Sequence, residues 1–124
     1  MLNRQGGPNH VGNHCLSPIL VDGDSVHVTP LFHILSQVAR TAPPGSVVLT
    51  TDGERPDGLW QVAIRAPDGS IAVHLFNETD TAVGVSLEDV EHTLRVSCPP
   101  LALLTVWLEG APAGPEWSAP DLEP

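Results

Sequence analysis

The chain contains no lysine and no tyrosine, and five arginines face fifteen aspartates and glutamates. The resulting formal charge of −10 has the wrong sign for binding a nucleic-acid backbone or an anionic membrane surface. The sequence also has no stretch that approaches the ~20 consecutive apolar residues of a membrane-spanning helix. We therefore expect no nucleic acid among its partners and no membrane span.

Cysteine is scarce as well. Cys15 and Cys98 are too few for a disulfide-dense scaffold, and their spacing leaves open whether they pair. The first residues have no basic start followed by an apolar run of about 7–15 residues, so they do not resemble a secretory signal. These absences do not indicate a cellular compartment. We expect a soluble protein.

Glycine and proline, by contrast, are abundant, with 11 and 13 residues among 124, and hydrophobic residues reach 41%. A chain of this length forms about one domain, which buries roughly two thirds of the surface that the unfolded chain exposes. Frequent turn residues and enough apolar residues for a core are typical of a β protein.

One helix is predicted in the first third of the chain. Thr29 and Pro30 suit the N-cap and the first helical position. Pro43 disfavours a helical conformation for the residue before it, so the helix should end near Thr41. Good turn residues at 22–25 separate two β-prone runs and predict a small hairpin before the helix. The helical spacing itself is carried by Leu31, Ile34, Leu35 and Val38.

From Ser46 onward the hydrophobic period changes to two, which indicates strands. The turn Pro67–Ser70 contains a proline that presets φ and a glycine for positive φ, so it is the clearest hairpin signal. We predict a mainly β fold, a β-sandwich of about six short antiparallel strands, preceded by a loop, the hairpin and the amphipathic helix. The strands are expected at 47–49, 60–64, 71–76, 83–87, 94–98 and 101–108.

Composition also predicts the domain organisation. Residues 1–45 hold the loop, the hairpin and the helix, and residues 46–110 hold the sandwich. Residues 111–124 consist largely of alanine, proline, glycine and acidic residues, and we expect a disordered tail there.

Three histidine and cysteine side chains suggest a metal site, because His10, His14 and Cys15 lie within six residues and zinc accepts both imidazole and thiolate. The set lacks the paired spacing of a zinc finger, and a fourth ligand would have to come from a distant strand. We therefore predict polar loop histidines, with no metal and no cofactor.

Catalytic groups are not evident either. The acidic residues fall in turns and loops, where solvated charges are the ordinary interpretation. A nucleophilic triad can be written from Ser17, His14 and Asp22, but no pattern in the sequence brings them together. We predict no catalytic residue in this chain. The acidic residues considered are Asp22, Asp24, Asp52, Glu54, Asp57, Glu88, Asp89 and Glu91.

Two further features have a structural and a functional interpretation. The tripeptide Asn77-Glu78-Thr79 matches an acceptor for N-glycosylation, a match that is common by chance. Trp60 and Trp107 fall on predicted strands, where we expect them to pack in the core, whereas exposed rings would form a platform for stacking sugars.

The segment GGPNHVGNHCLSPILVDGDSVHVTPLFHILSQVA at Gly6–Ala39 resembles the end of the catalytic barrel in glycoside hydrolase family 30, the glucosylceramidase-like enzymes. The segment VAIRAPDGSIAVHLFNETD at Val62–Asp80, with the last strand ending near Trp107, resembles the carboxy-terminal β-sandwich of the same family. Together the two segments extend the resemblance over residues 2–109.

The resemblance implies a retaining β-glycosidase whose acid and nucleophile are glutamates near the ends of the fourth and seventh strands of a (β/α)8 barrel. Residues 2–3 would correspond to the end of the eighth strand and residues 29–40 to the eighth helix, so both glutamates would lie upstream of this chain. In the family, residues of the intervening loop border the sugar pocket, and Asn13 and His14 occupy those positions. His14 stands where the family commonly has an aromatic residue.

We therefore expect a C-terminal segment of a family 30 glycoside hydrolase that is inactive alone. Its expected partners are the missing catalytic barrel, a β-glycoside, and a second copy of the chain through an uncovered sheet edge. The alternatives are a free-standing carbohydrate-binding or protein-interaction sandwich and, third, a small metal protein.

Overall fold

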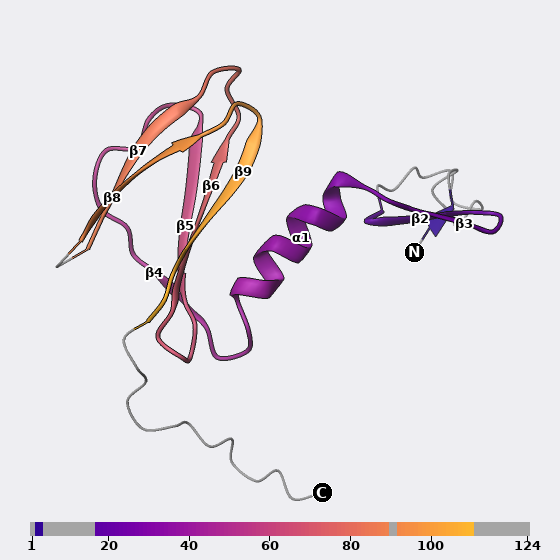
Figure 1. The fold of residues 1–124 in the computed structure, drawn as a ribbon, viewed down its shortest axis with the longest axis horizontal. Coiled ribbons are helices and arrows are strands. Elements are labelled where there is room, and N and C mark those ends of the chain that lie inside the picture. The colour runs from indigo at the N-terminus through magenta and orange to yellow at the C-terminus, as the bar shows by residue number, and fades with distance from the viewer. Residues whose placement is uncertain (1, 4–16, 90–91, 111–124) are drawn as a thin grey trace, which may run out of the picture. The chain divides into compact units, whose positions relative to one another are not determined.

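The structure, a computed structural model, describes residues 2–3, 17–89 and 92–110 (Figure 1). In this part the chain forms one helix and nine strands, and it clusters into two compact units, Met1–Arg40 and Thr41–Pro124. The tail predicted at 111–124 lies outside the described residues. The described part contains no helix long and apolar enough to cross a membrane.

The first unit contains a small sheet and most of the helix. Strand β1 (Leu2–Asn3) pairs in parallel with β2 (Ile19–Asp22), which forms an antiparallel hairpin with β3 (Ser25–Val28). The predicted hairpin is thereby confirmed. Gly23 in its turn has a φ of 58°, a left-handed conformation that glycine adopts without a steric penalty.

Helix α1 (Pro30–Thr41) begins and ends where the sequence predicts. The hydroxyl of Thr29 does not bond to the first turn of the helix in the way expected of an N-cap. It donates instead to the carbonyl oxygens of Ser17 at 2.8 Å and Pro18 at 3.2 Å, because the chain before the hairpin passes beside it. These bonds fix the end of the preceding loop to the start of the helix.

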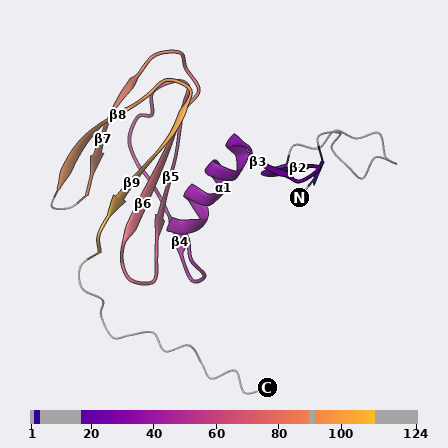
Figure 2. The ribbon, with the colours of Figure 1, turned by 45° about the vertical axis from the view of Figure 1, so that its right-hand side comes forward.

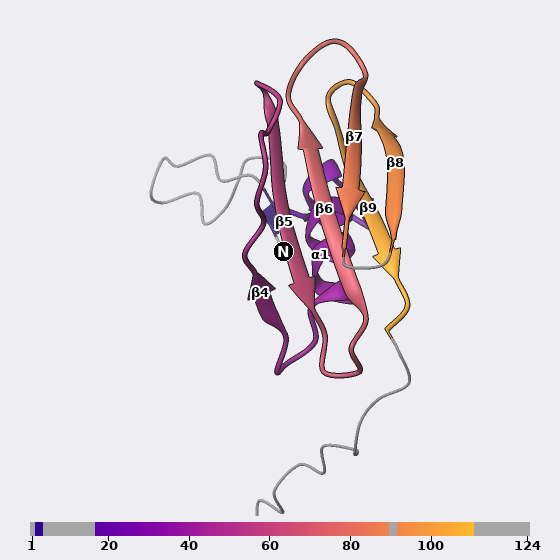
Figure 3. The ribbon, with the colours of Figure 1, turned by 90° about the vertical axis from the view of Figure 1, so that its left-hand side faces the viewer.

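The second unit is a sandwich of two antiparallel sheets. The larger sheet has the order β4-β5-β6-β9, and the smaller consists of β7 and β8 (Figure 2). Figure 3 shows the β7–β8 pair lying across one face of the larger sheet. All six predicted strands are present: β4 (Val47–Leu49), β5 (Leu59–Arg65), β6 (Ile71–Asn77), β7 (Val83–Glu88), β8 (Thr93–Cys98) and β9 (Ala102–Leu108).

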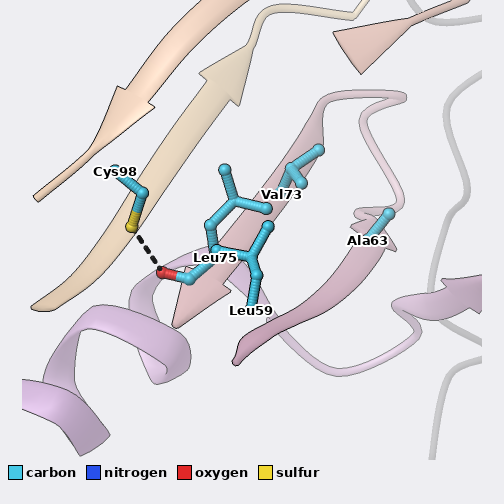
Figure 4. Close-up of a cluster of buried hydrophobic side chains, with 5 residues drawn as sticks. All are labelled: Leu59, Ala63, Val73, Leu75 and Cys98. Atoms are coloured by element: carbon cyan, nitrogen blue, oxygen red, sulfur yellow. Dashed lines mark hydrogen bonds between the residues drawn. The ribbon is translucent and has the colours of Figure 1, made fainter. Parts of the chain in front are cut away.

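The core lies between the two sheets and consists of five buried side chains (Figure 4). Leu75 and Cys98 are fully buried, and the Cys98 thiol lies 3.6 Å from the carbonyl oxygen of Leu75. In the small sheet, inward apolar residues alternate with outward polar residues, as expected for a sheet with one wet face. The five core residues are Leu59, Ala63, Val73, Leu75 and Cys98.

The turn between β5 and β6 confirms the strongest hairpin signal. Gly69 has a φ of 85°, and the backbone amide of Ala66 donates to the carbonyl oxygen of Ser70 at 2.9 Å. The hydroxyl and amide of Ser70 both donate to Asp68, at 2.6 and 2.9 Å, and these bonds lower the pKa of the Asp68 carboxyl below its ordinary value. This aspartate is therefore part of the turn and not of a catalytic pair.

The register of this hairpin determines which residues face the core. Ala63 lies opposite Val73 and Leu59 opposite Asn77, so the inward positions of β5 are Leu59, Gln61, Ala63 and Arg65. Trp60 consequently points to the other face, opposite Phe76. The expectation that Trp60 and Trp107 pack in the core does not hold, since their side chains are about half exposed.

Candidate functional site

The predicted sugar-contacting residues, Asn13 and His14, lie outside the described residues. The structure describes the end of their loop, where Ser17 is buried and its hydroxyl donates to the carbonyl oxygen of Ile19 at 2.8 Å. Asp22 lies at the exposed end of β2, and His14, the third member of the triad written from the sequence, lies outside the described residues.

The described carboxylates are spread over exposed turns and strand ends. A retaining glycosidase needs two carboxyl groups about 5–5.5 Å apart across the scissile bond, one of them with a raised pKa. Asp68, the carboxylate with the clearest pKa shift, is shifted downward. Within residues 17–89 and 92–110, no three histidine, cysteine, aspartate or glutamate side chains are grouped to hold a metal ion. The exposed acids among the described residues are Asp22, Asp24, Asp52, Glu54, Asp57, Asp68, Glu78, Asp80, Glu88, Asp89 and Glu109.

A buried polar cluster lies within the second unit, on the face of the large sheet opposite β7–β8. His74 of β6 is buried, and its Nε2 and Nδ1 atoms lie 2.8 Å from the hydroxyls of Thr41 and Thr105, respectively. A neutral imidazole donates at one nitrogen and accepts at the other, and a hydroxyl can fill either role. Burial lowers the pKa of His74, which favours this neutral form. The cluster therefore connects Thr41 to strands β6 and β9 through hydrogen bonds between uncharged groups.

The same face of the large sheet, which we call the outer face, is mostly apolar. The exposed fractions of its three aromatic side chains are 53% for Trp60, 40% for Phe76 and 45% for Trp107. A sheet face that is permanently in water normally has polar side chains at these positions. The register assigns to the outer face Val48, Trp60, Val62, Ile64, Ala72, His74, Phe76, Leu103, Thr105 and Trp107.

One of these aromatic rings already has a cationic neighbour. The guanidinium carbon of Arg55 lies 4.7 Å from the centre of the Trp60 ring, a cation–π contact. A sugar that stacks on tryptophan needs an open ring face, and Arg55 occupies one face of Trp60. This geometry weakens the case for a sugar platform at Trp60.

The outer face is a surface that the sequence analysis did not predict, although a signal for it was present. In β6 both alternating sets of side chains are largely apolar, since Val73 and Leu75 alternate with Ala72 and Phe76. A strand with apolar side chains on both of its faces is typical of a sheet that is covered on both sides.

Comparisons with known proteins agree with this architecture. Residues 43–106 match the profile of the glycosyl hydrolase family 30 beta sandwich domain. The chain is 34% identical over 90 residues to lysosomal acid glucosylceramidase of Mus musculus, which covers 71% of this chain and 18% of that protein. Its fold is similar to the solved structure of the endo-beta1,6-glucanase BT3312, with a TM-score of 0.74 and 18% identity over 89% of this chain and 25% of that one. The chain thus spans about a quarter or less of each of these relatives.

Proposed function

Because the chain belongs to glycoside hydrolase family 30 through its β-sandwich domain, we propose that this sandwich is the structural companion of a catalytic barrel and does not hydrolyse glycosides itself. The barrel is the partner that the resemblance implies. The proposal assigns the chain a role in supporting the catalytic domain, with the two glutamates of the reaction located on the barrel.

The observation that carries the proposal is the apolar outer face of the large sheet. β7 and β8 cover the opposite face. On the outer face Ala72 and His74 are buried, but the large rings of Trp60, Phe76 and Trp107 are exposed to solvent. Contiguous exposed apolar patches mark surfaces that another protein or domain covers. Burying such surface stabilises the assembly by roughly 25 cal/mol for each Å² removed from water.

The names of the two relatives support a proposal for the class of substrate, but not for one particular sugar or aglycone. The mouse relative is by name a glucosylceramidase and the structural neighbour an endo-β1,6-glucanase, so we propose a β-glycoside as the substrate of the complete enzyme. Within that enzyme Asn13 would donate or accept a hydrogen bond with a sugar hydroxyl. His14 replaces an apolar aromatic face by a smaller, titratable ring, which favours an aglycone that differs from that of relatives with the aromatic residue.

A free-standing carbohydrate-binding module is the second candidate, favoured by the exposed rings of Trp60 and Trp107. Under our proposal, titration calorimetry of the chain with methyl β-glucoside and with a β-linked glucan oligosaccharide is expected to give no saturable heat. Saturable binding that is lost in Trp60→Ala or Trp107→Ala, but retained in an Arg55→Ala control, would support the carbohydrate-binding module instead.

The small sheet leads to a prediction about association. β7 and β8 pair only with one another in the described part, so each has an edge that borders no further strand, and two strands alone are marginally stable. An open edge invites a strand from another chain. We expect the sedimentation coefficient to rise with protein concentration and amide exchange in β7 and β8 to be faster than in β5 and β6. A compact monomer at all concentrations, with strong protection throughout residues 19–108, would show that the chain is self-sufficient.

A further inference from the structure

The side chain of Asn77 joins two connections at one end of the sandwich. Asn77 is the last residue of β6 and is 0% exposed. Its amide nitrogen lies 2.7 Å from the carbonyl oxygen of Thr81, 3.2 Å from that of Cys98 and 3.0 Å from that of Pro99. Thr81 belongs to the β6–β7 connection, and Pro99 to the β8–β9 connection. One amide group thus connects carbonyl oxygens of two segments that are distant in sequence, Thr81 in one and Cys98 and Pro99 in the other.

The carbonyl oxygen of the Asn77 side chain accepts two hydrogen bonds, both from Thr79. It accepts a hydrogen bond from the backbone amide of Thr79 at 3.0 Å and lies 2.7 Å from the Thr79 hydroxyl. An asparagine oxygen that bonds the amide two residues later closes an Asx-turn. A backbone bond from the Leu101 amide to the Thr79 carbonyl oxygen, at 3.0 Å, adds a direct link between the two connections.

Asn77 and Thr79 are also the acceptor and the hydroxyl residue of the single Asn-X-Ser/Thr match in the chain. We infer that Asn77 is a structural amide and that this match cannot carry a glycan in the folded sandwich. N-glycosylation replaces one of the two amide hydrogens by a sugar carbon, which leaves one N–H for three carbonyl acceptors. The attached sugar would also have to extend into solvent from a side chain that has no exposed surface. Glycosylation at Asn77 and closure of this end of the sandwich therefore exclude one another.

The inference is tested by expressing the full chain behind a secretory leader in a glycosylating eukaryotic host. Peptide mass mapping with and without an endoglycosidase then measures occupancy of Asn77 separately in the protease-resistant and protease-sensitive fractions. The matched control carries Asp52→Asn with Glu54→Thr, which creates an acceptor in an exposed loop. We expect the control site to be occupied in the resistant fraction and Asn77 to be unmodified there, with any occupied Asn77 confined to the sensitive fraction. A protease-resistant chain with a glycan on Asn77 would overturn the inference.

A second measurement tests the structural role independently of the host. Asn77→Asp keeps the size of the side chain but removes the donors to Thr81, Cys98 and Pro99, so we expect the melting temperature to fall by about 10 °C or more. Thr79→Ser keeps both the hydroxyl and the glycosylation match and should melt within about 3 °C of the parent chain. Equal melting temperatures for Asn77→Asp and the parent chain would contradict the role assigned to the amide.

Discussion

Replacing Leu75 by alanine is expected to lower the free energy of unfolding by about 2–5 kcal/mol, the range typical of truncating a fully buried leucine. Leu75 has no exposed surface and lies in the core cluster with Leu59 and Val73 (Figure 4). Its strand, β6, is paired with β5 on one side and β9 on the other, so the cavity can collapse only partly. Urea unfolding followed by tryptophan fluorescence measures the loss.

The control for this prediction is the same substitution at an exposed leucine. Leu101 is 72% exposed in the β8–β9 connection and has a φ of 50°. Leu101→Ala removes the same atoms and leaves a Cβ at the left-handed position, so the backbone strain stays and the change should be within about 0.5 kcal/mol. Similar losses for the two variants would contradict the placement of the core between the two sheets.

Acidification is expected to destabilise the second unit through His74. Burial lowers the pKa of His74 in the folded state, while the unfolded chain keeps the ordinary histidine pKa of about 6.5. Between these two values the unfolded state binds more protons, so stability falls as the pH falls. The contribution is fully present above about pH 6.5 and is lost as the pH drops toward the folded value. Urea unfolding at a series of pH values measures this dependence.

Two variants separate His74 from the other titrating groups. His74→Gln keeps a polar side chain between Thr41 and Thr105 but does not titrate. We expect it to be less stable than the parent chain near neutral pH, by about 1–3 kcal/mol, and to have a weaker dependence of stability on pH below 6.5. His27→Gln, at an exposed position, should leave that dependence as it is in the parent chain. An unchanged dependence in His74→Gln would show that the buried imidazole is not its source.

The local elements of this fold could be predicted from sequence because their signals are local. Pro30 and Pro43 bracket the helix, and the residues Pro67–Ser70 specify the β5–β6 turn through proline, glycine and a side chain that bonds its own backbone. The family assignment was likewise predictable from contiguous segments, and the match at residues 43–106 confirms it.

The faces of the sheet could not be assigned in the same way. In β5 the alternation favours the wrong face, because Trp60 shares its face with apolar residues whereas Leu59 shares its face with Gln61 and Arg65. The structure nevertheless buries Leu59 in the core and leaves Trp60 about half exposed. The partners of His74 were equally hidden, since Thr41 and Thr105 lie 33 and 31 residues away along the chain. Such contacts join residues that are distant in the sequence, and no short sequence pattern encodes them. The predicted sugar contacts of Asn13 and His14 remain predictions.

The most direct test of the companion role is hydrolysis of an aryl β-glucoside by the purified chain. Because the described carboxylates lie on exposed turns and the family glutamates would lie on the barrel, we expect release of the aryl alcohol at the rate of a protein-free blank between pH 4 and 8. Hydrolysis well above the blank that disappears when Asp52, Glu54 or another acidic residue of this chain is replaced by its amide would contradict the account.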